Sequence, residues 1–405
     1  MAVLRIGSLM MVFVLAISHG AAAQDPAAAA PAVPPSLVDV ARDVESTELR
    51  VRRRALGALR EQSGPETLTL LALLVDDEDR GIREGAIEAI TRIYVEPPTG
   101  ERPGSVEGLF LVGPYHVTPW PAPAEAMREL TRALADEYPD IRRDAAYAVA
   151  IVAAVPVTDR VAFELVASLS DRDPAVRVAA ARALGRLQVR AAGVPLVGRV
   201  NDEVLAVRIA AIGALGELRE TQAVPALHDQ FSFYVRGVVG RAAIDALGRI
   251  AEAASVPLFE AQTGSGYPAH RRAAYEGLAR SGAAKLAADR IKSAMASERD
   301  ARVRLAMAYA LAASGDPLTP IAQALADSDQ RPQALEYLVD LARTRTADVA
   351  VLLRDQEPVL RRHAAIALGF AGGPQATSAL AAARQEPDAA VRGAIDVAQL
   401  RLRNP

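Results

Sequence analysis

Acidic and basic side chains recur together along this 405-residue chain, and they are the first candidates for chemistry. The pairs are Asp171 with Arg177, Asp202 with Arg208, and Asp300 with Arg304. A carboxylate beside a guanidinium can serve acid–base chemistry, but an active site does not repeat many times along one chain. We therefore predict structural ion pairs within each repeat, exposed to solvent and each contributing about 0–1 kcal/mol.

Histidine, cysteine and loop patterns give no support for a catalytic or metal site. Beyond the N-terminal segment the histidines are His116, His228, His270 and His363, far apart in sequence, and there is no cysteine. Zinc-binding spacings such as HxxxH or HExxH are missing, as are Gly-x-Ser-x-Gly, the P-loop and Gly-x-Gly-x-x-Gly. We predict no enzyme activity, no metal and no cofactor.

The charge pattern argues against a nucleic-acid partner. The net charge is −3, so no large basic field surrounds the chain. Arginine clusters lie at 50–54, 271–272 and 361–362, but in other copies the second residue is apolar, as in Val178, Ile209 and Leu305. No basic stripe runs through successive repeats, so we interpret the clusters as solvated faces.

A stretch at 94–123 carries the aromatic candidates for binding, which are Phe110, Tyr115, His116 and Trp120. It holds the only tryptophan of the chain and seven prolines, so no regular helix is expected through it. In one alternative the aromatic side chains fold back over a groove between two repeats. In the other they present an anchor to a partner, since Trp and Tyr dominate interface hot spots.

These residues are positioned by an internal repeat. Its copies align on Arg83, Arg142, Arg177, Arg208, Gly240, Arg271, Arg304, Arg361 and Arg392, with steps of 31 to 33 residues from 177 to 304. A degraded copy fits at 333–341 and a first copy at 49–59. A fixed period of this length indicates a solenoid of roughly ten or eleven units.

Each unit reads as two helices. Residues 160–169 have helical apolar spacing, and Asp173 is a good N-cap before Pro174 at the first helical position. An apolar stripe then follows at Val176, Ala180, Ala183, Leu184 and Leu187. The abundant alanines, with Gly185, predict close helix approach. The fold class is therefore all-α, an alpha-alpha superhelix of short helical hairpins.

The repeat resembles the HEAT family, especially the short HEAT-like repeats also found in phycobilin lyases. The residues that carry the resemblance run from Asp173 to Gly185, with counterparts at 207–216 and 360–369. The resemblance implies a HEAT-like or armadillo-type solenoid over about 48–402 apart from the insert. It implies little about function, because function resides in sites on folds.

The N-terminus has the pattern of a secretory signal. Arg5 is followed by a short apolar run at 9–17 and by small residues at Ala21–Ala23. We predict a signal peptide at 1–23, an Ala/Pro-rich linker at 24–36 and the solenoid at 37–405. The chain is then exported to a bacterial periplasm or secreted, with no stable membrane insertion after cleavage; an uncleaved anchor is the alternative.

Together these features predict a non-catalytic, extracytoplasmic scaffold for protein–protein interaction. A protein partner would contact the concave helices and the 94–123 insert, because stacked repeats make extended concave surfaces. One alternative is a bilin lyase-like protein that handles a chromophore. Another is a structural spacer in an envelope assembly.

Overall fold

The protein is described here by a computed structural model that covers residues 35–96 and 103–403. The expected signal peptide, residues 24–34 of the expected linker, and residues 97–102 of the insert lie outside the described residues. Within them every regular element is a helix, and the only strand-like pairing is a single bridge between Val95 and Val117. The all-α prediction is confirmed.

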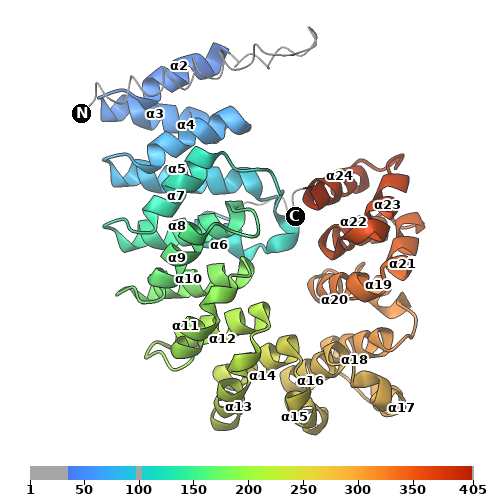
Figure 1. The fold of residues 1–405 in the computed structure, drawn as a ribbon. Helices are drawn as coiled ribbons and strands as arrows, with labels where there is room; N and C mark the ends of the chain where they lie inside the picture. The colour runs from blue at the N-terminus through green and yellow to red at the C-terminus, as the bar shows by residue number, and fades with distance from the viewer. Residues whose placement is uncertain (1–34, 97–102, 404–405) are drawn as a thin grey trace.

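The described helices form eleven antiparallel hairpins, as the repeat predicted (Figure 1). They are α2 (Pro35–Val44) with α3 (Leu49–Arg60), α4 (Pro65–Val75) with α5 (Arg80–Tyr94), α7 (Ala124–Ala133) with α8 (Pro139–Val152), α9 (Asp159–Ser168) with α10 (Pro174–Arg186), α11 (Gly193–Arg199) with α12 (Leu205–Leu218), α13 (Val224–Phe233) with α14 (Val238–Ile250), α15 (Val256–Gln262) with α16 (Pro268–Arg280), α17 (Ala284–Met295) with α18 (Ala301–Ala313), α19 (Thr319–Ala324) with α20 (Arg331–Thr344), α21 (Thr346–Val351) with α22 (Pro358–Ala371), and α23 (Gly373–Ala382) with α24 (Ala389–Arg403).

The hairpins stack into a tightly curved superhelix. The second helices of successive hairpins pack on one another along the inside of the arc, and first helices such as α13, α15 and α17 lie outside (Figure 1). Apolar side chains between the two layers are fully buried, including Val176, Ala180, Ala183 and Leu184. The stripe predicted from the repeat is therefore the core of each unit.

Capping explains where the inner helices begin. The Asp173 side chain accepts a hydrogen bond from the Ala175 backbone N–H, and Pro174 occupies the first turn of α10. Asp300 likewise accepts from the N–H groups of Arg302 and Val303. A carboxylate here satisfies amides that lack a helical partner.

The eroded copy at 333–341 is a regular part of the array. It lies within α20, a 14-residue helix that begins at Arg331. The sequence analysis did not include Arg331 among the recurring arginines, because the step from Arg304 to Arg331 is shorter than the usual period.

The insert is more ordered than its prolines predicted. Its described part contains the short helix α6 (Val106–Leu111), which Ser105 caps by accepting from the Gly108 N–H, and a 3-10 turn at Pro114–His116. The expectation of no helix was wrong for this segment because no proline falls between 104 and 113. The insert then returns beside α5 through the bridge at Val95 and Val117.

Candidate interaction surface

Ten recurring arginines, which we call the ladder arginines, make the same contact in ten of the eleven hairpins. They are Arg52, Arg83, Arg142, Arg177, Arg208, Arg271, Arg304, Arg331, Arg361 and Arg392. Each guanidinium donates to the carbonyl oxygen six residues earlier, in the turn after the first helix of its hairpin. The ladder therefore ties each second helix to the end of the first.

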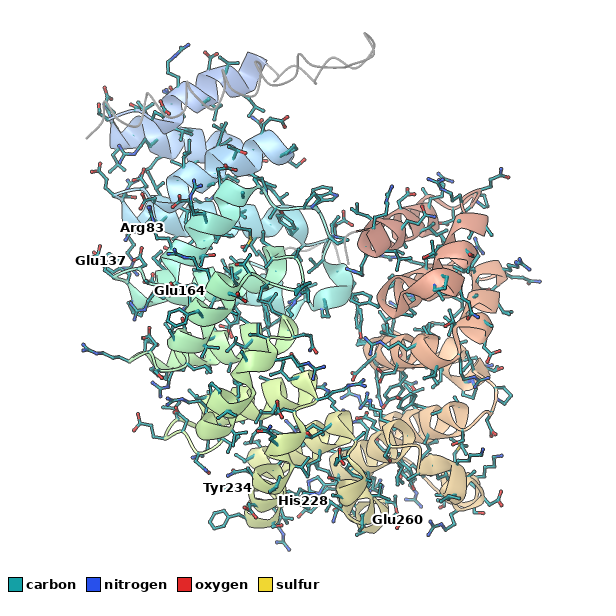
Figure 2. The ribbon with its side chains drawn as sticks, viewed as in Figure 1. Arg83, Glu137, Glu164, His228, Tyr234 and Glu260 are labelled. Carbon is teal, nitrogen blue, oxygen red and sulfur yellow. The ribbon has the colours of Figure 1, made fainter. Side chains whose placement is uncertain are left out.

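Six ladder arginines also bind a carboxylate of the next hairpin, which corrects the predicted pairing. Arg177 makes two hydrogen bonds to Asp202, at 3.1 and 2.9 Å, and it bonds only to the backbone oxygen of Asp171. Asp171 instead receives Arg142 at 2.7 Å. Arg83 lies between Asp136 at 2.9 Å and Glu137 at 3.7 Å (Figure 2). The pairs join neighbouring repeats.

These pairs are also more buried than predicted. The side chains of Arg177 and Asp202 are only 8% and 4% exposed. Asp202 additionally accepts a hydrogen bond from the Val204 N–H. Burial alone would raise the pKa of Asp202, but the bonds from Arg177 and Val204 outweigh this effect, so the pKa lies below its ordinary value. The recurring charged residues therefore hold neighbouring hairpins together. A binding site must be formed by other residues.

From α8 onward, the inner face of the superhelix is formed by two positions on each second helix, five and nine residues after the ladder position. On successive second helices they are Tyr147 and Ile151, Arg182 and Arg186, Gly213 and Glu217, Asp245 and Arg249, Glu276 and Arg280, Tyr309 and Ala313, Glu336 and Asp340, Ile366 and Phe370, and Val397 and Arg401. Charged and tyrosine side chains predominate. In several copies the sequence shows these positions as charged residues four apart, but the sequence analysis did not identify them as one face.

Inner-face residues from hairpins distant in sequence meet in one polar network around Arg280. The Arg280 side chain, only 6% exposed, donates to Asp340 at 2.9 Å and to Glu336 at 3.1 Å. Asp340 also lies 3.8 Å from Arg219, at the end of α12, and Glu336 lies 3.9 Å from Arg249. These contacts cross the interior of the arc, from the N-terminal to the C-terminal arm.

Two stacked tyrosines complete the network. The Tyr309 and Tyr337 rings lie 4.3 Å apart and nearly parallel. The Tyr309 hydroxyl donates to Asp340 at 3.2 Å, and the Tyr337 hydroxyl donates to Glu276 at 2.5 Å. Burial raises the pKa of Glu276, although Arg280 and Arg272 oppose this, and burial with the Glu276 charge raises that of Tyr337. The network therefore joins acidic side chains, Arg280 and the two tyrosine hydroxyls.

The predicted aromatic residues of the insert divide into two groups. Phe110 packs on Tyr147 with ring centroids 4.9 Å apart and beneath the guanidinium of Arg186. Tyr115 packs edge-on against Phe370 of α22 at 5.0 Å. Trp120 stays 42% exposed and touches only Tyr94 edge-on at 6.5 Å among the described rings. The insert thus reaches the far end of the chain, which neither alternative anticipated.

This contact between insert and C-terminal hairpins, the closure, joins the two arms of the superhelix. Arg401 of α24 donates to the carbonyl oxygen of Val117 at 2.8 Å and lies 3.7 Å over the Phe370 ring. His116 sits at the same junction, where burial and the Arg362 charge lower its pKa. In Figure 1 the C-terminal helix meets the insert near the centre of the molecule.

The four predicted histidines do not come together as a metal site. His228 bonds the Ser255 hydroxyl at 3.0 Å, His270 packs edge-on against Phe231, and the Nδ1 of His363 lies 2.6 Å from the Val359 carbonyl oxygen. Across 35–96 and 103–403, no three His, Cys, Asp or Glu side chains are grouped to hold a metal. No helix in these ranges is long and apolar enough to cross a membrane.

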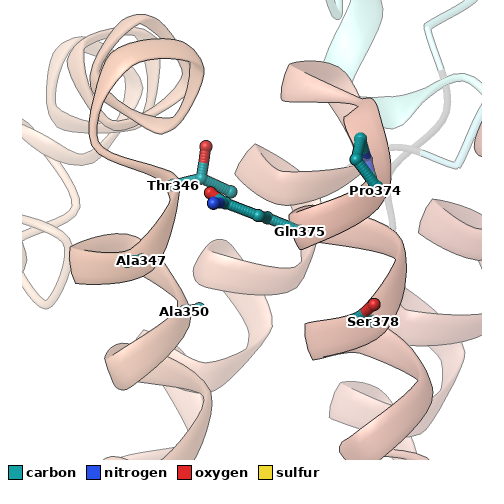
Figure 3. A pocket seen from close by; sticks show the side chains of 6 residues that line it. All are labelled: Thr346, Ala347, Ala350, Pro374, Gln375 and Ser378. Atoms are coloured by element: carbon teal, nitrogen blue, oxygen red, sulfur yellow. The ribbon is translucent and has the colours of Figure 1, made fainter.

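Two hollows on the described surface are shallow and open. One, of about 340 Å³, lies between α21 and α23 and is lined by Thr346, Ala350, Gln375 and Ser378, with Ala347 and Pro374 (Figure 3). The other, of about 410 Å³, lies at the starts of α16 and α18, beside Arg241, Asp245, Arg272 and Asp300. Neither is enclosed in the way typical of a small-molecule site.

Two stretches of the chain match a known family. Residues 163–232 and 235–312 match the model of HEAT repeats. These two stretches are therefore similar to HEAT repeats. The match covers α9 to α18, and the flanking hairpins carry the same ladder arginine.

Several solved structures are similar to this chain. One is an engineered protein, with 18% identity over 91% of this chain and 99% of that chain and a TM-score of 0.42. Another is the complex of CpcE and CpcF of phycocyanin lyase from Nostoc sp. PCC7120, with 18% identity, 70% and 97% coverage and a TM-score of 0.40. A third is importin beta, with 16% identity, 89% and 57% coverage and a TM-score of 0.41. No curated protein matches the sequence.

Proposed function

We propose that this HEAT-repeat protein is a non-catalytic scaffold for protein–protein interaction that acts outside the cytoplasm. The observation that carries the proposal is the division of labour in each hairpin. Core and ladder positions stack the repeats, while the inner-face and insert positions carry Arg, Tyr and Trp side chains that stacking does not need. These three residue types dominate protein interface hot spots.

The exposed part of the insert is the surface that we expect a protein partner to contact. Leu111 is 61% exposed and Trp120 is 42% exposed, whereas Phe110 packs on the inner face and Tyr115 packs in the closure. An aromatic and an aliphatic side chain on one short segment suit a partner's apolar pocket. The location outside the cytoplasm rests on the secretory pattern at 1–23.

Site-specific cross-linking tests the proposal. A photo-reactive phenylalanine at position 120 should capture a defined partner in the native host's envelope fraction, and the Leu111→Ser change should reduce that capture. The matched control is position 163 on α9, where Phe163 is 69% exposed on another hairpin. Equal capture from 120 and 163, or none from 120, would remove the insert's role. A protein that purifies with a bound tetrapyrrole would instead favour chromophore handling.

A further inference from the structure

The hollow at the starts of α16 and α18 gathers charged side chains from three successive hairpins. The inner helices α14, α16 and α18 pack side by side in that order at the base of the arc (Figure 1). Each contributes an arginine to the hollow of about 410 Å³, namely Arg241, Arg272 and Arg302. Two aspartates, Asp245 and Asp300, line it as well, so three guanidiniums lie with two carboxylates.

Two of the three arginines have no partner in the hollow. Arg272 donates to Asp245 at 3.1 Å, and Asp300 accepts from N–H groups in the first turn of α18. Both aspartates are therefore engaged. Arg241 and Arg302 are exposed, and neither guanidinium forms an ion pair or a hydrogen bond with any residue in 35–96 or 103–403.

Apolar side chains lie around the same hollow. Pro268 and Val303 form part of its wall. Tyr267, directly before Pro268, is 45% exposed, and Val238, one turn before Arg241 on α14, is 48% exposed. Tyrosine and arginine are enriched at protein interfaces relative to the rest of a protein surface. The hollow therefore offers free cations and apolar surface together.

We propose that this hollow binds an acidic segment of a protein partner. An Asp or Glu side chain of the segment bonds Arg241 and Arg302, and an apolar neighbour lies on Val238 or Tyr267. Charge complementarity carries the assignment, because free guanidiniums form charge-assisted hydrogen bonds with a carboxylate. The inference rests on the proposed scaffold function and extends it to a second surface that does not require the insert.

The shape and charge of the hollow favour this occupant over others. An open hollow admits one side chain of an extended segment, whereas a small molecule needs a more enclosed site. Membrane-binding segments carry clusters of about four to eight basic residues. Here two aspartates lie among the three arginines, which disfavours an anionic membrane but leaves two guanidiniums for a single carboxylate.

Selection from a peptide library tests the proposal without a known partner. The purified full-length protein is immobilised, and random dodecapeptides displayed on phage are selected against it. We expect the enriched sequences to place Asp or Glu next to an aliphatic or aromatic residue. The tightest of these peptides is then synthesised with a fluorophore, and its dissociation constant is measured by fluorescence anisotropy.

Variants locate the binding of the selected peptide. The double variant Arg241→Met with Arg302→Met should weaken it about tenfold or more, because both charge-assisted contacts are lost. Val238→Thr should weaken it less, since it replaces only one methyl group. The control is Arg160→Met with Arg172→Met, which removes the same charge from exposed arginines of the α9–α10 hairpin that also lack a described partner. It should leave binding unchanged.

The proposal is overturned if no acidic sequence is enriched, or if the double variant binds the selected peptide as tightly as the unmodified protein does. It is also overturned if the unmodified protein sediments with phosphatidylglycerol vesicles, or self-associates in analytical ultracentrifugation, and the double variant does not. Those results would assign the hollow to a membrane or to a second copy. Peptide binding that persists when cross-linking from position 120 fails would remove the insert's role and leave this site in place.

Discussion

The ladder arginines stabilise the helical repeat in two ways. The carbonyl groups at the end of a first helix lack helical partners, and Arg177 supplies donors to Asp171 and Arg172. The same guanidinium also donates a hydrogen bond to the Asp202 carboxylate of the next hairpin. At Gly240 the arginine is missing, and an added Cβ would lie 2.2 Å from the Tyr234 carbonyl oxygen, so the backbone itself fills that place.

The ladder predicts unequal consequences for equivalent arginines. Arg177→Met should lower the free energy of unfolding by about 3 kcal/mol, because it leaves Asp202 buried without its partner. Arg304→Met should lower it by only about 1 kcal/mol, because Arg304 is exposed and bonds to two carbonyl oxygens but to no carboxylate. Urea unfolding of both variants measures the difference, and equal losses would contradict an inter-repeat role for Arg177.

The ladder carboxylates predict a loss of stability in acid. The hydrogen bonds from Arg271 lower the pKa of Glu298 from an ordinary 4.5 to about 2. The unfolded chain therefore takes up a proton that the folded chain refuses, and the free energy of unfolding falls as the pH drops from about 4.5 to 2. Glu298→Gln should flatten this slope by up to one proton, as measured by urea unfolding at several pH values. An unchanged slope would rule out this residue's contribution.

At the scale of the helix, small residues set how closely the inner helices cross. Gly185 of α10 faces Ala214 of α12, and a Cβ added to it would lie 2.9 Å from the Ala214 Cα. Gly216 meets Ala246, and Gly369 meets Ala398, in the same way. The close approach predicted for Gly185 is confirmed. The tight crossing brings successive inner helices near enough for the superhelix to curve strongly.

Two glycines of neighbouring helices should therefore respond oppositely to alanine. Gly185→Ala forces α10 and α12 apart and should lower the free energy of unfolding by about 2 kcal/mol. Gly213→Ala, in α12, meets no atom within 4 Å and should raise it by about 1 kcal/mol, because alanine is the better helix former. Thermal or urea unfolding checks both signs. A stabilising effect of Gly185→Ala would show that α10 and α12 leave room for a methyl group where they cross.

At the scale of the molecule, the superhelix is closed twice over. Arg219 and Asp340 meet across its interior, and Tyr115 with Val117 meets Phe370 and Arg401 at the closure. The inner face therefore carries charged and aromatic side chains that contact one another, and a partner that binds there must compete with these contacts. Specific ring contacts such as that of Tyr115 with Phe370 contribute about 0.5–1.5 kcal/mol beyond their burial.

Weakening the closure should open the arms. The double change Tyr115→Ala with Phe370→Ala removes the ring contact that joins them, and we expect a larger radius of gyration in small-angle X-ray scattering. Trp120→Ala is the control within the same insert, because Trp120 is exposed and contacts only Tyr94 among the described rings. An unchanged radius in the double variant, with its helical content intact, would mean that the inner polar network alone holds the arms together.

The sequence by itself determined the repeating unit, because caps, apolar stripes and small residues act within one hairpin or between neighbours. Asp173, Val176 and Gly185 could be interpreted without knowing the rest of the chain. Tertiary structure alone decided which charges pair and what the insert touches. Arg177 binds Asp202 rather than the Asp171 side chain because stacking places the carboxylate of the next hairpin beside its guanidinium. Tyr115 contacts Phe370 because the small rotation added by each hairpin accumulates over the whole array. No local pattern encodes that sum, so contacts between distant repeats emerge only when the superhelix closes.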